Sequence, residues 1–332
     1  MQALKQAHPM SPQYLSHLSR RSFLRTASLV ACGLPVVLGN PYRLFAASAP
    51  TDRAYTPPTS PRATINFNLD WKFLRDDAKD AESPVFDDSN WSTVSTPHSF
   101  NDVDSFRTII SHSGGDRGTY KGLAWYRKHF KLPVELSGQN LFLEFEGMRQ
   151  AGDIFLNGKQ VGLYENGVNA YGIDISNSVK IGGAENVLAV RVDNRTTYAE
   201  RATNTPFEWN VNDFNPDHGG IDRSVWLHVT GKIHQTLPLY YGLESQGIYV
   251  HASNFDIARK SADITIESEV RNSSGDRATV GITAVIVDQA GTVRAQFDGA
   301  LAAIADGAKT VYRSTGTLEG ARFWRPDDPH LY

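Results

Sequence analysis

The sequence predicts an all-β fold, organised as two antiparallel β-sandwiches in series over residues 65–230 and 237–332. Apolar residues alternate with polar ones in short segments along most of the chain, which is the pattern of half-buried strands. Turn signals separate these segments, and helical periodicity is not sustained for long anywhere after the first fifty residues. The best helical candidate is Ala300–Ala308, which Asp306 and Gly307 weaken.

The composition is that of an ordinary globular chain, with 332 residues, 40% hydrophobic and 21% charged. This length suits two domains. The formal net charge of -3 provides no basic surface, so we expect no nucleic-acid partner. A single cysteine excludes an intramolecular disulfide framework and a thiolate metal cluster. We expect no dedicated metal site, because the histidines are scattered and the carboxylates lack ligand spacing.

The first 49 residues are predicted to be an export signal rather than part of the fold. They contain five basic residues and no Asp or Glu. The pair Arg20-Arg21, followed by Phe23-Leu24, resembles the twin-arginine signal of bacteria. The apolar stretch after it, residues 26–39, is too short to span a bilayer. We therefore expect export by the twin-arginine route to the periplasm or the extracellular space.

Two alternatives remain for the end of this signal. Leu29-Val30-Ala31-Cys32 resembles a lipobox, in which Cys32 would be lipidated, whereas residues 45–49 suit cleavage without a lipid. Residues 50–64 contain Thr56-Pro57-Pro58 and Pro61 and are predicted to be a solvated linker. No membrane attachment is expected beyond the signal or this lipid.

The strands of the first sandwich follow in chain order. Leu141, Leu143 and Phe145 alternate with their neighbours, as do the apolar residues of 188–192 and 225–229. Between them, Asn157-Gly158 separates two apolar runs, and this pair tolerates positive φ at both central positions of a hairpin turn. Four glutamates alternate with apolar residues and are therefore predicted to lie on solvated sheet faces: Glu144, Glu146, Glu267 and Glu269.

A domain boundary is predicted near residues 231–238, after which strand patterns restart. Residues 264–270 alternate, residues 272–276 form a turn, and residues 280–286 form the next strand. Leu331-Tyr332 is expected to begin the closing strand of the second sandwich, which would therefore be truncated at its last strand. Because an unpaired neighbouring strand would remain, we expect this sandwich to be marginally stable alone.

Several motifs occur together in one chain. They are Phe67–Phe73 with Phe86–Trp91 and Val94–His98, Tyr120–Lys128, Ile154–Gly162 with Glu185–Asn194, Asn215–Leu227, and Phe323–Tyr332. Together they resemble the non-catalytic N-terminal half of glycoside hydrolase family 2, whose best-known members are β-galactosidases. The resemblance implies a jelly-roll, galactose-binding-like sandwich, then an immunoglobulin-like sandwich, then a (β/α)8 barrel. The barrel is missing from this sequence.

The missing barrel has a consequence for catalysis. Retaining glycosidases need an acid/base carboxyl and a nucleophilic carboxylate about 5 Å apart. In the resembled family both are barrel glutamates, and the acid/base glutamate follows an asparagine. The sequence contains no Asn-Glu dipeptide. We therefore expect this chain alone not to cleave glycosides.

The resemblance also implies substrate-binding residues in the first sandwich. In β-galactosidases, the loop before a Gly-Ile-x-Arg motif reaches the active site, where an aspartate binds galactosyl hydroxyls directly or through a divalent or sodium ion. The matching motif here is Gly220–Arg223, and Asp213 is the stand-in for that aspartate after a one-residue shift. Asn212 and Asn215 are rivals, and the alternative for all three side chains is that they cap a loop.

A second segment before the Trp-Tyr-Arg strand makes Tyr120 a further substrate-contact candidate by the same resemblance. Of Trp125 and Tyr126, one is expected to pack in the core rather than against a ligand. The two aromatic residues alternate on a predicted strand, so they should point to opposite faces of the sheet.

Two functional hypotheses of different class follow. The first is the front half of an exported β-galactosidase acting on a β-galactoside or a related glycan. The second is a stand-alone, lectin-like carbohydrate-binding sandwich. The same front half serves β-glucuronidases and β-mannosidases, so these remain alternatives to the galactosidase. Enzymes of this family often assemble, and a homo-oligomer therefore stays open.

Overall fold

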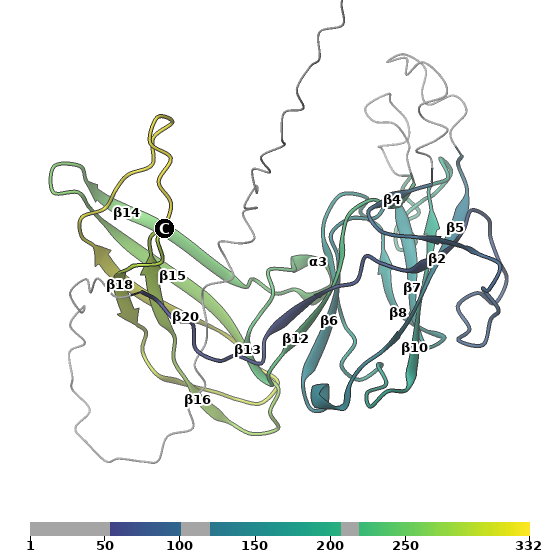
Figure 1. The fold of residues 1–332 in the computed structure, drawn as a ribbon, viewed down its shortest axis with the longest axis horizontal. Helices are drawn as coiled ribbons and strands as arrows, with labels where there is room; N and C mark the ends of the chain where they lie inside the picture. Colours follow the sequence, from purple (N-terminus) through teal and green to yellow (C-terminus); the bar gives the residue numbers. More distant parts are fainter. Residues whose placement is uncertain (1–53, 101–119, 207–218) are drawn as a thin grey trace, which may run out of the picture.

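The computed structural model describes residues 54–100, 120–206 and 219–332, which are almost entirely β-strands and turns (Figure 1). Two sandwiches lie next to each other, the earlier part of the chain in teal and the later part in green and yellow. The signal predicted over residues 1–49 lies outside the described residues.

The first sandwich contains two main antiparallel sheets. Its strands are β1 (Ala63–Asn66), β2 (Trp71–Leu74), β3 (Ser92–Val94), β4 (His98–Ser99), β5 (Leu123–Lys131), β6 (Asn140–Phe145), β7 (Ala151–Leu156), β8 (Lys159–Tyr164), β9 (Tyr171–Asp174), β10 (Glu185–Asp193), β11 (Gly220–Ile221) and β12 (Val225–Thr230), with a short 3₁₀ turn η2 (Val134–Leu136). One sheet has the order β1-β12-β6-β9 and the other β3-β2-β5-β10-β7-β8, while β4 pairs with β11. The main core lies between the two large sheets, where alternate residues of β5, β6, β10 and β12 meet.

The predicted hairpin is confirmed. Strands β7 and β8 pair across Asn157-Gly158, whose φ angles are 55° and 84°. The Asn157 side chain adds a second function, because its Oδ1 accepts a hydrogen bond from the backbone N–H of Val187 at 3.1 Å. The turn is therefore anchored to the neighbouring strand β10 as well as being favoured locally.

The prediction of solvated glutamates is wrong for Glu144. Leu141, Leu143 and Phe145 face the core as expected, but the opposite face of β6 is covered as well. Glu144 is 4% exposed and accepts a hydrogen bond from His228 Nε2 at 2.8 Å. A polar residue on a strand indicates a solvent-exposed face only when nothing packs on that face. Here other parts of the chain pack on it.

The six-stranded sheet is also covered on both faces. Tyr126 lies in the main core, as one of the two aromatic residues was expected to do. Trp125 points the other way and packs with Phe86 and Trp91, which belong to the segment joining β2 to β3. Its indole Nε1 donates to Asp77 at 2.9 Å. Trp125 and Tyr126 are therefore both structural.

The second sandwich begins with a connector that includes β13 (Ile233–Gln235) and the single turn α3 (Tyr240–Leu243). Its further strands are β14 (Ile248–Asp256), β15 (Ser261–Asn272), β16 (Ala278–Val280), β17 (Thr283–Val287), β18 (Val293–Asp298), β19 (Ala302–Ile304) and β20 (Lys309–Leu318). The long strand β15 pairs with β20 on one side and with β14 and β13 on the other. Strands β16 and β19 form one smaller pair and β17 and β18 another.

Three sequence predictions for this domain need correction. The helical candidate 300–308 is strand β19 followed by a turn, because Ala302–Ile304 pair with β16 and Gly307 adopts a φ of 75°. Glu269 is buried rather than solvated and accepts hydrogen bonds from Thr236 Oγ1 and Gln246 N. Leu331 and Tyr332 lie in no strand, and Tyr332 instead receives a hydrogen bond from the backbone N–H of Arg322.

The connector packs on the first sandwich instead of crossing open solvent. Leu237 and Leu239 cover Phe142, so these residues form a small separate core on the outer face of the four-stranded sheet. The amide of Asn140 donates to His234 Nδ1 at 3.3 Å and to Ser273 Oγ at 3.0 Å. These contacts join β6 of the first sandwich to β13 and to the turn that follows β15 in the second sandwich.

The predicted linker 50–64 is described from Ala54 onward. Its described part is largely exposed, but contacts hold it at both ends, and its last two residues belong to β1. Ala54 forms a β-bridge with Thr292 of the second sandwich, and Tyr55 N donates to Gly291 O at 2.9 Å. At the other end, Arg62 Nη1 donates to Gln235 O at 3.0 Å.

Candidate functional site

Phe100, which precedes residues 101–119, and Gly219, which follows residues 207–218, lie together at one end of the first sandwich. The backbone N–H of Phe100 donates to Gly219 O at 3.0 Å, and strands β4 and β11 pair directly beside this bond. Gly219 fits closely here, since a Cβ on it would lie 2.0 Å from the Phe100 ring and 2.7 Å from Asn194 Nδ2. Both borders therefore meet at the same place (near β4 in Figure 1).

Tyr120 belongs to this end and is half-buried. Its hydroxyl donates to Leu123 O at 2.9 Å, and its ring meets Phe100 edge-on at 5.7 Å. The guanidinium of Arg75 lies 5.5 Å from the ring centre, within the range of a cation–π contact. Burial, with a further effect from the nearby Asp76 carboxylate, raises the pKa of Tyr120. The phenol is therefore a protonated donor at neutral pH, and its role in substrate binding stays a prediction.

Asn194 holds Tyr120 in place and was not singled out by sequence reasoning. It is 3% exposed, its Oδ1 accepts from Gly122 N at 2.8 Å, and its Nδ2 donates to Tyr120 O at 3.0 Å. The side chain thus ties the turn before β5 to the end of β10. A sequence signal for Asn194 exists, because it is the last residue of the Glu185–Asn194 motif. That motif indicated the family but not a role for this side chain.

The three other candidates, Asn212, Asp213 and Asn215, lie outside the described residues. Their segment is bounded by Pro206 and Gly219. Of the two, Gly219 lies at the end of the sandwich that holds Tyr120. The proposed roles of the three side chains stay predictions.

A polar hollow of about 300 Å³ lies on the first sandwich, where β5, β7 and β10 meet the 195–204 segment. Its acids are already paired with arginines. Asp153 binds Arg201 at 2.6 Å, and Asp193 binds Arg195 at 2.6 Å. The oxygens of these carboxylates are already occupied by charged hydrogen bonds, so the two acids are poor candidates for general acid/base work.

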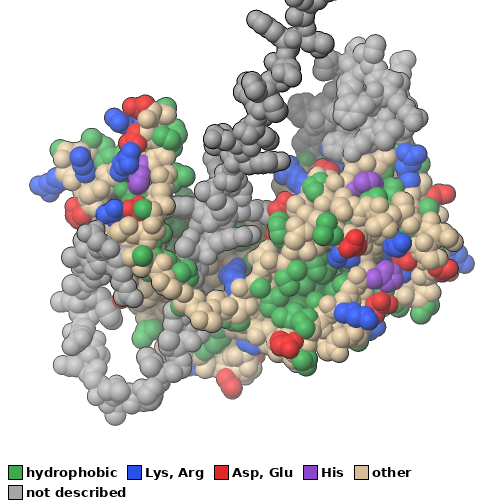
Figure 2. Space-filling view, viewed as in Figure 1, with side chains coloured by type: hydrophobic (Ala, Val, Ile, Leu, Met, Phe, Trp, Pro, Cys, Tyr) green, Lys and Arg blue, Asp and Glu red, His purple; other side chains and the backbone are tan. Residues whose placement is uncertain are grey.

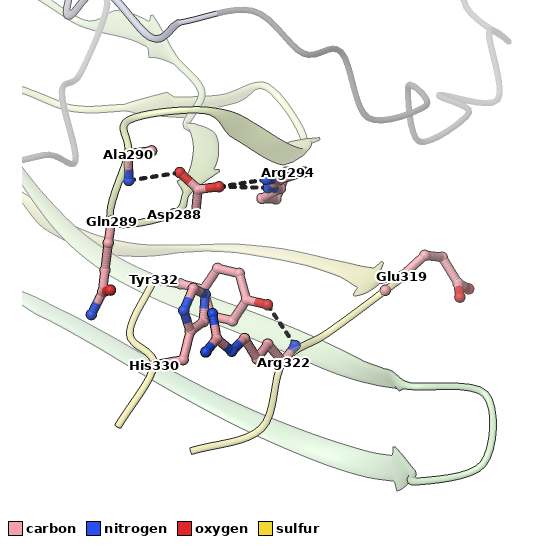
Figure 3. A pocket seen from close by; sticks show the side chains of 9 residues that line it. Asp288, Gln289, Ala290, Arg294, Glu319, Arg322, His330 and Tyr332 are labelled. Carbon is pink, nitrogen blue, oxygen red and sulfur yellow. Dashed lines mark hydrogen bonds and ion pairs between the residues drawn. The ribbon is translucent and has the colours of Figure 1, made fainter. Parts of the chain in front are cut away.

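A larger hollow of about 610 Å³ lies on the second sandwich, between the β17–β18 turn and the segment after β20 (Figure 3). Asp288 accepts hydrogen bonds from Thr292 N, from Arg294 and from Ala290 N, and these bonds lower the pKa of its carboxyl. Arg322 lies across the hollow and is paired with Asp328. This hollow is charged, open and internally paired, and it contains no two free carboxyl groups facing each other.

Within residues 54–100, 120–206 and 219–332, no group of three or more His, Cys, Asp or Glu side chains is placed to hold a metal ion. Over the same ranges, no helix is both long and apolar enough to cross a membrane.

The surface in the view of Figure 2 mixes both signs of charge. Lys and Arg side chains alternate with Asp and Glu over the described part of this face, and hydrophobic side chains gather near its middle, over the first sandwich. No strongly basic area is visible among the described residues of this face. This distribution gives no particular attraction for a polyanion.

Two family models match the chain. Residues 120–227 match the "Glycosyl hydrolase 2 galactose-binding domain-like" model, and residues 248–332 match "Glycosyl hydrolases family 2". These ranges correspond to the bulk of the first sandwich and to the second sandwich from β14 onward.

Known proteins resemble both sandwiches together. A β-glucuronidase of Formosa agariphila is 39% identical over 275 residues, which are 82% of this chain and 28% of the relative. A β-galactosidase of Thermoanaerobacter pseudethanolicus is 28% identical over 82% of this chain and 32% of the relative. A solved structure, described as a β-glucuronidase from glycoside hydrolase family 2, matches with a TM-score of 0.75 and 38% identity, over 81% of this chain and 28% of that one.

The chain therefore spans about a third or less of the length of these relatives. Its described residues form a galactose-binding-like jelly-roll sandwich and an immunoglobulin-like sandwich, and they form no barrel. Fold, family models and relatives agree, and this chain belongs to glycoside hydrolase family 2.

Proposed function

We propose that the two sandwiches are the supporting N-terminal domains of an exo-acting β-glycosidase whose chemistry is carried by a further catalytic domain. The observation behind this proposal is the share of the relatives that the chain matches, 28% of the Formosa agariphila β-glucuronidase. The acids in the two described hollows are also consistent with it, because most of them are paired with arginines. The second class of function, a lectin-like binding protein, is the competing outcome in the tests below.

For the substrate, we propose a β-glucuronide. The support is the identity of 39% to the Formosa agariphila β-glucuronidase, against 28% to the β-galactosidase of Thermoanaerobacter pseudethanolicus. A β-galactoside, favoured by the sequence motifs, is the second candidate. Selectivity between the two sugars is set by the groups that touch the sugar, so activity on each substrate decides between them.

Activity measurements test both proposals. The purified 332-residue chain is assayed with p-nitrophenyl β-glucuronide and β-galactoside, beside the product of the complete reading frame. We expect no turnover by the chain alone and preferred hydrolysis of the glucuronide by the complete product. Turnover by the chain alone that is lost on changing one carboxylate would refute the supporting role. Preferred turnover of the galactoside would refute the substrate assignment only.

Isothermal titration distinguishes the lectin-like alternative. The chain alone is titrated with glucuronic acid, galactose and their methyl β-glycosides. Supporting domains should give no measurable heat of binding, because they contribute only part of a sugar site. Saturable binding of one sugar by the folded chain would favour the lectin-like function instead.

We also propose that the protein is exported by the twin-arginine route. The support is Arg20-Arg21 with the apolar run after it. Changing Arg20→Lys and Arg21→Lys together should hold the protein in the cytoplasm, as seen by cell fractionation. Unchanged export of this double variant would overturn the route. Mass spectrometry of the exported protein separates cleavage near residues 45–49 from lipidation at Cys32.

A further inference from the structure

Strand β14 is an open edge of the second sandwich. It is nine residues long and pairs with β15 along one side, and no described strand pairs with its other side. Such an edge presents a row of unpaired backbone N–H and C=O groups. Another strand can complete this row by adding to the sheet.

Residues 248–253 of this strand lack the features that normally protect an edge. Between Ile248 and Asp256 it contains no Lys, Arg or Pro. Its register irregularity is confined to the end near Ser253, which leaves residues 248–253 regular. Two side chains of this regular part are exposed although they are large and apolar, Tyr249 at 62% and Val250 at 44%.

We propose that β14 pairs antiparallel with β14 of a second copy of this chain, about a two-fold axis beside Val250. In this register Val250 meets its own copy, and Ile248 lies opposite the partner's Ala252. Tyr249 then lies opposite the partner's His251. Residues directly opposite each other share a face of the sheet, so each pair is in side-chain contact.

The side chains on each face suit this register. Tyr249 and His251 are already ring neighbours, with centroids 5.3 Å apart, so pairing gathers four rings on one face. On the other face, Ile248 packs against the core of the sandwich, and Val250 with its copy extends that apolar surface. No acidic or basic pair of like charge lies opposite itself within residues 248–252.

We expect the strand that pairs with this edge to come from a second copy of the chain. In the register centred on Val250, each side chain of residues 248–252 lies opposite one that suits it. An isologous contact of this kind closes as a dimer and does not propagate. The edge contact is small compared with the roughly 1,200 Å² of standard stable interfaces, so we expect a weak dimer whose population rises with concentration.

Sedimentation velocity over a wide concentration range tests the proposal, with the 332-residue chain as the starting protein. Val250→Lys places two like charges at the axis, and we expect the dimer dissociation constant to rise about tenfold or more. The matched control is Val311→Lys, since Val311 is 48% exposed and lies on β20 of the same sheet. This control should leave the dissociation constant unchanged.

A mixing experiment tests the axis itself. Val250→Glu alone should also dissociate, whereas a mixture of Val250→Glu with Val250→Lys should recover a dimer of one copy of each. Circular dichroism shows whether each variant has kept its β-sheet content, so that misfolding is recognised. A wild-type chain that stays monomeric, equal effects of the two lysine variants, or no recovery on mixing would each overturn the proposal. None of these readouts depends on glycosidase activity.

Discussion

His234 is expected to make the two-domain unit sensitive to mild acid. Its ring is 6% exposed at the contact between the sandwiches, where it packs on Phe142 with centroids 5.6 Å apart. Burial, with a smaller effect from the cation of Arg62, lowers the pKa of His234 from 6.5 to about 4. Lys232 and Arg271 also lie close, so a proton on His234 would add a further positive charge to a cluster of cations.

The sign and the size follow from proton linkage. Between pH 6.5 and 4 the unfolded chain binds a proton at His234 that the folded chain does not, so stability falls as the pH falls through this window. The full effect is about 3 kcal/mol, and about 2 kcal/mol of it is lost between pH 7 and pH 5. Above pH 6.5 both states are neutral at this residue, and the effect disappears.

Urea unfolding at pH 7, 6 and 5, followed by tryptophan fluorescence, measures this loss. We expect His234→Gln to make the loss between pH 7 and pH 5 smaller by about 2 kcal/mol, whatever the stability of the variant at pH 7. His330→Gln is the control, since this ring meets Tyr332 edge-to-face, away from the contact between the sandwiches. Equal pH dependence in the wild type and His234→Gln would refute the reasoning.

Two further predictions concern the end of the first sandwich and are checked by the same unfolding measurement at pH 7. Asn194→Ala leaves the backbone groups of Tyr120 and Gly122 without their partners and should cost about 1–3 kcal/mol, whereas the exposed Asn169→Ala should change stability by less than about 0.5 kcal/mol. Gly220→Ala should cost about 2 kcal/mol or more, because φ is 140° and the new Cβ would lie 2.3 Å from His98 O. Gly138→Ala is the control, because the φ of Gly138 is also positive, at 77°, but no atom lies within 4 Å of the added Cβ. A loss of stability as large as that of Gly220→Ala would contradict the steric argument.

Local patterns predicted the parts of the fold whose causes are local. The Asn157-Gly158 turn and the inward set of β6 followed from turn chemistry and from alternation. The burial of Glu144 could not be predicted in this way, because the cover over that sheet face comes from residues 237–243, about a hundred positions later. Alternation identifies which residues share a face but does not identify what packs on it.

The site was less predictable than the fold. Tyr120 was proposed as a ligand contact, and its hydroxyl is already bonded to Leu123 O three residues on. The residue that organises this end, Asn194, has no chemistry of its own to attract notice, since its function depends on two backbone groups more than seventy positions away. Roles that consist of holding backbone are visible only when the chain segments have been brought together.

The packing of Leu237 and Leu239 on Phe142 affects how the gene should be cut. Expression of the first sandwich alone, ended at residue 230 where its last strand finishes, would uncover an apolar strip on its outer sheet and invite aggregation. Tyr241 also reaches back to receive a hydrogen bond from Glu165 N at 2.9 Å. A soluble fragment should therefore continue through Ser245, so that Leu237, Leu239 and Leu243 remain packed over the apolar surface around Phe142.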